Sequence, residues 1–238
     1  ATSIGAALTM IALAVPAILI WVGRPPVRVP PANTVPGERP AAARSATQIR
    51  NAAFRDLSFW TITVPFALLL VAQVGFIVHQ ISFLTPAMGR ERAGLTVALM
   101  SVMAVVGRVV FGAVVDRLDQ RKASAASAVS QALALVIMIN TRDEVALFAA
   151  SALFGFSVGN MITLPSLIVQ REFDAASFGV LVSLVTAIGQ FAYAFGPGLI
   201  GLLRDAFGSY TVPFYVCVAL QIAAAAIVLV RSRAGPAL

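Results

Sequence analysis

Seven apolar runs, each long enough to cross a membrane as a helix, constrain this chain more than any other feature. A spanning helix needs about 20 mostly apolar residues, and these runs are too long for strands and lack their alternation. The runs cover residues 5–22, 57–84, 94–115, 123–140, 145–169, 178–203 and 210–230. We therefore expect an all-α membrane protein with seven transmembrane helices.

The composition excludes most other classes of protein. Hydrophobic residues make up 59% of the 238 residues and charged residues 11%, whereas soluble domains have about 45–50% and about 25%. A soluble enzyme, a disordered chain and a small secreted domain held by disulfides are therefore excluded. The one cysteine, Cys217, cannot form an internal disulfide or a four-ligand metal site. We expect no metal and no cofactor.

The distribution of basic residues predicts the orientation in the membrane. Twelve of the 17 lie in segment 24–56, in the loops after the third and fifth runs, and in the tail, whereas the alternate loops carry four. Because basic loops favour the cytoplasmic side, we expect the Pro- and Arg-rich segment and the C-terminus to be cytoplasmic, in the inner (plasma) membrane. The net charge of +7 then reflects topology, and nucleic acid is not an expected partner.

The loop after the third run carries the most informative motif. It reads Gly112-Ala-Val-Val-Asp116-Arg117-Leu118-Asp119-Gln120-Arg121-Lys122. This resembles the G-x-x-x-D-R-x-G-R-[KR] loop of the major facilitator superfamily, in the copy between helices eight and nine. Asp119 replaces the usual glycine, and Gln120 replaces a basic residue. We expect Gly112 to allow close helix approach and Asp116 to accept hydrogen bonds at a helix N-terminus. Arg117 and Arg121 would pair with acids and complete a conformational latch.

A second resemblance lies in the sixth run, where Gly196, Pro197 and Gly201 are similar to the Gly/Pro-rich helix that packs between the two halves of these transporters. The resemblance covers essentially the whole chain. It implies that residues 1–23 form helix six of twelve, 24–56 the central cytoplasmic linker, 57–231 the C-terminal six-helix half, and 232–238 a cytoplasmic tail. We expect a short helix near the end of the linker, over residues 41–55. Because the sequence begins with Ala1 and lacks helices one to five, we interpret it as a fragment.

Arg108 is the one basic residue inside an apolar run. It lies about 10 Å along a helix from Val115, and its burial costs at least about 2.5–3.5 kcal/mol. Ala104 and Gly112 share its stripe and indicate that it faces other helices. Since guanidinium pairs bidentately with carboxylate, we predict an anion site, with a structural arginine that reaches the interface as the alternative. Arg108 resembles the helix-eight arginine of the monocarboxylate transporter and oxalate–formate antiporter branches, although Ala104 stands where monocarboxylate transporters often have an acid.

Further polar side chains in the runs predict a polar central cavity. The residues predicted to line it with Arg108 are His79, Gln80, Asn160 and Gln190. His79 has a side chain with an unperturbed pKa near neutrality, so it would couple protons or contact substrate. For each of these residues, an interhelical hydrogen bond is the alternative role.

These features predict a secondary active or facilitative transporter, an antiporter or a symporter, that moves a small monocarboxylate-like organic anion by alternating access. The sequence has no G-x-x-x-x-G-K-[ST] loop for nucleotide, so a gradient would supply the energy, and the chain would not be an enzyme. The expected partners are the anionic substrate, the lipid bilayer and the N-terminal half. Efflux of an amphipathic drug and a truncated scaffold without transport stay open as alternatives. A retinal protein is excluded because the one lysine, Lys122, lies in a loop.

Overall fold

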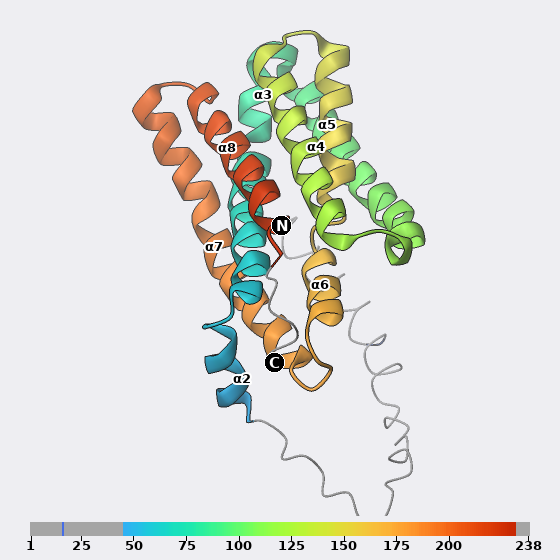
Figure 1. Cartoon of the computed structure of the whole chain (residues 1–238). Helices are drawn as coiled ribbons and strands as arrows, with labels where there is room; N and C mark the ends of the chain where they lie inside the picture. The colour runs from blue at the N-terminus through green and yellow to red at the C-terminus, as the bar shows by residue number, and fades with distance from the viewer. Residues whose placement is uncertain (1–15, 17–44, 232–238) are drawn as a thin grey trace, which may run out of the picture. The chain divides into compact units, whose positions relative to one another are not determined.

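The regular structure of the described part of the chain is entirely helical. A computed structural model describes residue 16 and residues 45–231 (Figure 1), so the predicted helix over 5–22 and most of the linker lie outside the described residues. The elements are α2 (Ala46–Ala53), α3 (Leu57–Val114), the 3-10 turn η1 (Val115–Arg117), α4 (Gln120–Asn140), α5 (Glu144–Val158), α6 (Leu164–Glu172), α7 (Phe178–Phe207) and α8 (Thr211–Val228). In this part of the chain, α3 with η1, α4, α7 and α8 are long and apolar enough to cross a membrane. The prediction of an all-α membrane fold is confirmed.

Short polar side chains fix where several helices begin. Ser45 and Gln48 form a reciprocal capping box at the start of α2, which confirms a short helix inside the predicted range of 41–55. The carboxylate of Asp56 accepts a hydrogen bond from Ser58 N at 2.8 Å at the start of α3, and Asp143 accepts from Ala146 N at 2.8 Å at the start of α5. Such caps satisfy backbone N–H groups that have no partner within the helix.

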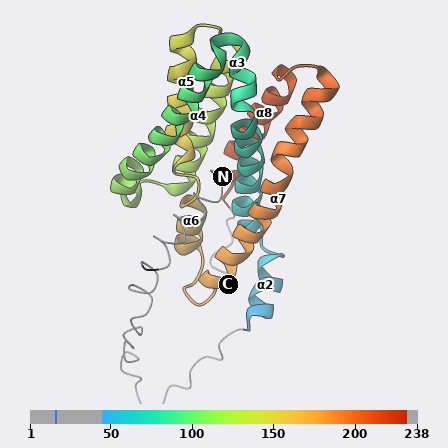
Figure 2. The same ribbon diagram turned by 180° about the vertical axis from the view of Figure 1, so that it is seen from behind.

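The long helix α3 contains two of the predicted membrane helices. They are joined at Gly89, whose φ of 79° and ψ of 162° reverse the chain direction, a conformation that glycine adopts at little cost. Figure 2 shows the first half of α3 running through the middle of the bundle and the second half returning along one side. The two predicted runs, 57–84 and 94–115, are therefore separate helices in space, as expected.

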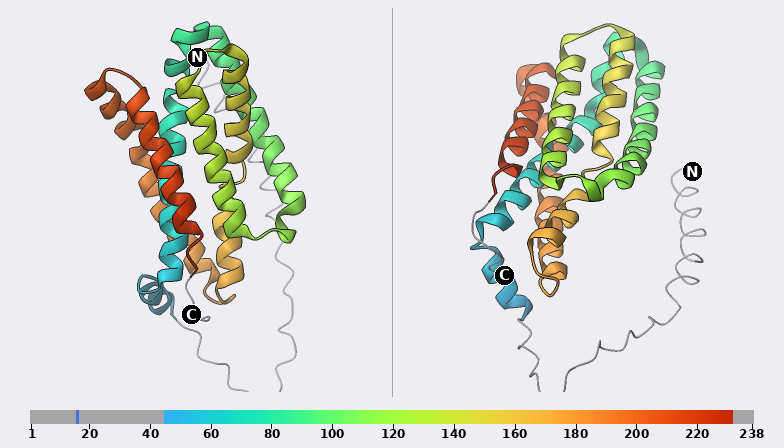
Figure 3. Two further views of the ribbon diagram at one scale, coloured as in Figure 1. Left: turned by 45° about the horizontal axis from the view of Figure 1, so that its top comes forward. Right: turned by 45° about the vertical axis from the view of Figure 1, so that its right-hand side comes forward.

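The core lies where the first half of α3 meets its neighbours. α3 packs on α5, α7 and α8, and α4 packs on α5 and α8, an arrangement that the two views of Figure 3 make visible. The ring of Phe76 on α3 lies 4.7 Å from that of Phe154 on α5 and 5.2 Å from that of Phe214 on α8. All three rings are fully buried, so this aromatic cluster ties three helices together.

A glycine seam joins the second half of α3 to α5. A Cβ added at Gly107 would lie 2.1 Å from Phe156 O, one at Gly155 2.2 Å from Met100 O, and one at Gly159 2.1 Å from Ala104 O. Glycine at these positions lets the two backbones approach closely. Gly112 makes no such approach within the described residues, because no atom there lies within 4 Å of a Cβ placed on it. Gly107 approaches α5 instead, since it is five positions before Gly112 and a helix turns by about 140° over five positions.

The predicted run over 145–169 is not one helix. α5 ends at Val158, residues 159–163 form turns, and α6 begins at Leu164. The 15 residues of α5 extend only about 22 Å at 1.5 Å per residue, which is less than the hydrocarbon thickness of about 30 Å. α5 and α6 run end to end (Figure 1), so together they supply the length that one spanning helix would.

Candidate functional site

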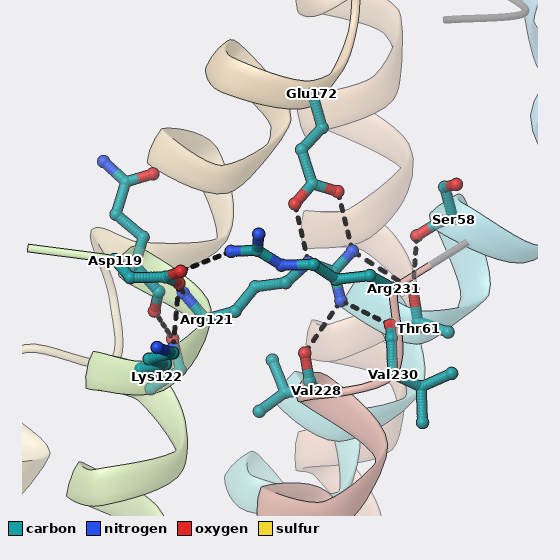
Figure 4. A network of polar contacts seen from close by, with 11 residues as sticks. Ser58, Thr61, Asp119, Arg121, Lys122, Glu172, Val228, Val230 and Arg231 are labelled. Atoms are coloured by element: carbon teal, nitrogen blue, oxygen red, sulfur yellow. Dashed lines mark hydrogen bonds and ion pairs between the residues drawn. The ribbon is translucent and has the colours of Figure 1, made fainter. Parts of the chain in front are cut away.

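A buried arginine network closes the end of the bundle where α3 begins and α8 ends. Arg121, at the start of α4, has a side chain only 2% exposed. Its Nε donates to Glu172 Oε1 at 2.6 Å and its Nη2 to Glu172 Oε2 at 2.7 Å. This bidentate pair links α4 to the end of α6, and paired guanidinium and carboxylate groups form the strongest class of protein hydrogen bond. We call Arg121 and its partners the Arg121 network (Figure 4).

The remaining N–H groups of Arg121 reach two further helices. Nη2 donates to Thr61 Oγ1 on α3 at 3.2 Å, and Nη1 donates to Val228 O and Val230 O, at 2.8 and 3.1 Å, at the end of α8. With these bonds all five guanidinium hydrogens have an acceptor. Arg121 thus connects α3, α4, α6 and α8 at one point, as expected for a buried charge that must be fully paired.

Asp119, not Asp116, caps the helix that follows the loop. The carboxylate of Asp119 accepts from the N–H of Arg121 at 3.1 Å and of Lys122 at 3.2 Å, and it also pairs with Arg231. Partial burial acts to raise the pKa of Asp119, but hydrogen bonds from the Lys122 N–H and the Arg231 side chain outweigh it and bring that pKa below its ordinary value. Asp116 itself lies inside the turn η1, and within the described residues its carboxylate accepts no hydrogen bond from a helix N-terminus, so its predicted role at a neighbouring helix stays a prediction.

Arg171 ties this loop to α6. Its Nη2 donates to Asp116 O at 3.0 Å and its Nη1 to Leu118 O at 3.2 Å. The side-chain amide of Gln120 has one orientation in which both its oxygen and its nitrogen find a partner. In it, the oxygen accepts from Arg171 Nε at 3.2 Å and the nitrogen donates to Leu167 O at 3.0 Å. The two residues that depart from the family motif, Asp119 and Gln120, are therefore both engaged in contacts that hold the loop.

Two other predicted latch residues make no such contacts. Arg117 is exposed, and within the described residues neither its side chain nor the carboxylate of Asp116 has a polar partner. The pairing of Arg117 with an acid therefore does not occur inside this part of the chain. Both groups are free to contact something outside it.

Arg108 lies on the second half of α3 and reaches the break between α5 and α6. Its Nε donates to Gly159 O at 3.2 Å, which is the first carbonyl beyond the end of α5. Carbonyl groups at a helix C-terminus carry a partial negative charge, so this position stabilises the guanidinium. The Nη1 and Nη2 groups have no polar partner among the described residues, which leaves four N–H donors available.

A groove of about 290 Å³ lies beside Arg108. One wall comes from α3 and η1, and the other from the α5–α6 turn and α6. The lining residues are Arg108, Phe111, Gly112, Val115, Thr163, Ser166 and Leu167. The groove thus combines one cation, two hydroxyl groups and an apolar surface, which is the character of a small-molecule site. Gly112 contributes to this groove because its missing side chain leaves the wall open.

His79 joins three helices at the opposite end of the bundle. Its Nε2 lies 3.1 Å from Pro197 O on α7, and its Nδ1 lies 3.2 Å from the Tyr210 hydroxyl before α8. Because a carbonyl only accepts, Nε2 carries the proton and Nδ1 accepts from Tyr210. A Cβ at Gly201 would lie 3.8 Å from the His79 ring, and one at Gly196 would lie 2.7 Å from Val71 O. Gly196, Pro197 and Gly201 therefore lie at the contact between α7 and α3.

The predicted cavity residues are not gathered in one place. Gln80 is fully buried and neither of its amide atoms has a polar partner in the described part of the chain. Asn160 is 3% exposed, in the turn beyond α5, and its Oδ1 likewise has no partner there. Gln190 is exposed on α7. Of these three, only Asn160 belongs to the segment that carries the groove.

Sequence reasoning missed several residues of these sites. Glu172 and Thr61 complete the Arg121 network, and Ser166 lines the groove. Gln73, Gln131 and Gln221 form a buried cluster in which Gln73 Nε2 donates to Gln131 Oε1 at 3.0 Å and Gln221 Nε2 to the same atom at 3.5 Å. For Glu172 the sequence offered one signal, since it is the acidic residue nearest the end of the fifth apolar run.

Within the described residues, no group of three or more His, Cys, Asp and Glu side chains could hold a metal ion.

Comparison with known proteins identifies the family. No curated protein is significantly similar to the chain. The family model of the Major Facilitator Superfamily matches residues 88–237, well over half of the 238 residues. This range includes the second half of α3, the loop motif and every helix that follows. The chain therefore belongs to the Major Facilitator Superfamily, a family of transmembrane transporters, and is an integral membrane protein.

Proposed function

We propose that this chain is the C-terminal half, with the preceding helix and linker, of a secondary transporter that moves a small organic anion by alternating access. The observation that carries the proposal is Arg108, an arginine inside a membrane helix that lines a groove and whose Nη groups have no polar partner among the described residues. Such a charge is costly in a membrane, and a carboxylate repays that cost through bidentate pairing. Substrate sites of this type lie between the two halves.

The Arg121 network would make the half move as one body. Because Arg121 joins α3, α4, α6 and α8, these helices keep their arrangement while the half rocks. The free carboxylate of Asp116 and the free side chain of Arg117 would contact the N-terminal half on the cytoplasmic side and complete the latch. In this proposal, the linker over 24–56 and the tail over 232–238 lie in the cytoplasm of a cell whose inner (plasma) membrane holds the protein.

The other predicted substrate residues lie in different surroundings and would take different roles. Gln190 lies on an exposed stripe of α7 with Ser183, Thr186 and Tyr193, spaced as one face of a helix, and we propose that this face borders the cavity. Asn160 would support the groove from the turn beyond α5. His79 and Gln80, which have buried or interhelical surroundings, would act on substrate only through the packing of α3.

Ligand-dependent heat stability of the full-length protein tests the proposal. A ligand present at 100 times its Kd stabilises the folded state by about 2.7 kcal/mol. We expect short-chain carboxylates to raise the melting temperature and their neutral amides to have no effect, with the rise lost in Arg108→Ala. Arg90→Ala, which removes an exposed arginine from the start of the second half of α3, is the matched control and should keep the rise.

The alternatives give different results in the same assay. Stabilisation by amphipathic cationic drugs that persists in Arg108→Ala would favour a drug efflux transporter, for which the exposed aromatic side chains of Phe191 and Phe195 on α7 would be suitable. No stabilisation by any small molecule, together with no transport, would favour a membrane scaffold.

A further inference from the structure

The segment that joins α2 to α3 presents an aromatic surface whose indole N–H is already satisfied. The ring of Phe54, at the end of α2, lies 5.9 Å from the rings of Phe59 and Trp60 on α3. Trp60 Nε1 donates to Phe54 O at 3.0 Å. Phe54, Trp60 and the neighbouring Leu57 are exposed, whereas Phe59 is fully buried. The exposed part of this surface is therefore apolar and held in one arrangement.

Two arginines flank this surface. Arg50 lies one turn before Phe54, since the N–H of Phe54 donates to Arg50 O at 3.1 Å and residues four apart share a helix face. Arg55 follows Phe54 directly. Both arginines are exposed, and neither guanidinium has a polar partner within the described residues. Each can therefore offer five N–H donors to a group outside this part of the chain.

The one acidic residue among residues 45–60, Asp56, is already engaged. Its carboxylate accepts from Ser58 N at 2.8 Å, at the start of α3, where the helix dipole favours a negative charge. The segment thus keeps an excess of positive charge that an anion can balance. We call the exposed side chains of this segment the Arg50 patch, which consists of Arg50, Phe54, Arg55, Leu57 and Trp60.

The Arg50 patch lies where a membrane helix begins. α3 is apolar and long enough to span a membrane from Leu57 onward, and α2 lies beyond its start, at the end of the bundle (Figure 1). From α2 into α3, the exposed side chains change from charged to aromatic and apolar. A phospholipid has the same order, with its phosphate outside and its acyl chains inside, and tryptophan rings favour the boundary between them.

We propose that the Arg50 patch binds an anionic glycerophospholipid. Arg50 and Arg55 pair with the phosphate, which a guanidinium can bind bidentately, and the aromatic rings and Leu57 pack on the glycerol and the first part of an acyl chain. A zwitterionic phospholipid carries a cation beside its phosphate, and this cation would meet two arginines without a free acid in the segment. The inference goes beyond the proposed function, because it does not depend on what Arg108 binds.

Quenching of tryptophan fluorescence tests the proposal in the full-length protein. The protein would be reconstituted in phosphatidylcholine vesicles with a rising fraction of phosphatidylglycerol whose acyl chains are brominated, because bromine quenches tryptophan on contact. Subtracting the signal of the Trp60→Phe variant isolates Trp60. We expect half-maximal quenching of Trp60 at an at least about fivefold lower fraction of brominated phosphatidylglycerol than of brominated phosphatidylcholine. Fivefold corresponds to about 1 kcal/mol, the attraction of one basic residue to an anionic membrane.

Arg50→Gln combined with Arg55→Gln should abolish this preference, so that the two lipids quench at equal fractions. Continued quenching by brominated phosphatidylcholine would show that the variant is folded in the membrane. The matched control is Arg90→Gln combined with Arg142→Gln, which removes two exposed arginines from the opposite end of the bundle. It should keep the fivefold preference, since these arginines lie outside the Arg50 patch.

Three results would overturn the proposal. Equal quenching of Trp60 by the two lipids in the wild-type protein would show that the patch does not select anionic lipid. Equal loss of the preference in both double variants would show a general effect of surface charge. No quenching of Trp60 by either lipid would show that protein covers the patch. None of these results bears on the anion site at Arg108, so the proposed function stands or falls separately.

Discussion

At the scale of single residues, Arg121 shows how a charge is held inside this protein. Its side chain is 2% exposed, and every guanidinium hydrogen has an acceptor on α3, on α6 or at the end of α8. A buried charge pair adds little net stability compared with apolar residues, but removal of one partner leaves the other charge unpaired at a large cost. The value of Arg121 therefore lies in fixing one arrangement of four helices.

Glu172→Gln tests this cost. The substitution leaves Arg121 buried without its counter-charge, so we expect a loss of about 3–5 kcal/mol in the free energy of unfolding, measured by denaturant unfolding in detergent. The matched control is Glu144→Gln, which breaks the pair with Arg92, where the two side chains are 37% and 60% exposed. Exposed pairs contribute about 0–1 kcal/mol, so similar losses in both variants would contradict the account.

The lowered pKa of Asp119 predicts that the stability of the protein depends on pH. Its pKa in the folded protein lies below the ordinary value of 3.8, so its stabilising contribution is complete above that value and is lost as the pH falls through the lowered pKa. Asp119→Asn should therefore flatten the acid limb of a plot of melting temperature against pH, measured from pH 6 to pH 3. Parallel curves for the wild-type protein and the variant would show that Asp119 makes no such contribution.

At the scale of helices, the glycine seam between α3 and α5 determines how closely they pack. At Gly107, Gly155 and Gly159 an added Cβ would overlap backbone of the facing helix, and backbone cannot move aside as a flexible side chain does. Overpacking of a well-packed interior costs about 1–3 kcal/mol and occasionally more. The seam also positions the α5–α6 break against Arg108.

Gly107→Ala tests the seam. We expect this variant to lose about 3 kcal/mol of stability or more, at the upper end of the range for overpacking, and to lower the melting temperature by several degrees. Gly94→Ala, also on α3, is the control because no atom of the described residues lies within 4 Å of an added Cβ there. Alanine favours a helix over glycine by up to about 1 kcal/mol, so Gly94→Ala should be neutral or stabilising. Equal effects of the two substitutions would rule out the close contact.

The helices also show which features a sequence predicts. Apolar runs of about 20 residues placed the helices α3, α4, α7 and α8 correctly, because hydrophobic length is a local property. The end of α5 at Val158 does not depend on local sequence alone, since the carbonyl of Gly159 accepts a hydrogen bond from Arg108 on another helix. The capping role of Asp119 was missed because the apolar run begins only at residue 123, whereas α4 begins at Gln120.

At the scale of the whole molecule, the described part of the chain presents two kinds of surface. Apolar side chains such as Val105 and Val109 on α3 and Phe191 and Leu202 on α7 are more than 60% exposed, as side chains facing lipid or another helix bundle are expected to be. The polar stripe of α7 and the groove beside Arg108 interrupt this surface. The sequence indicated Arg108 as a candidate because its charge is unusual in a membrane helix, whereas the place of Ser166 in the groove follows only from the position of α6 beside α3.

The measurement that tests the central claim most directly is counterflow of a labelled short-chain carboxylate by the full-length protein in liposomes. If Arg108 holds the substrate charge, wild-type protein loaded with unlabelled acid should accumulate the labelled acid transiently. Arg108→Ala should reduce the rate by at least about tenfold, because a charge-assisted hydrogen bond contributes about 1.5–3 kcal/mol, while Arg90→Ala should match the wild type. Accumulation that is unchanged in Arg108→Ala would contradict the account.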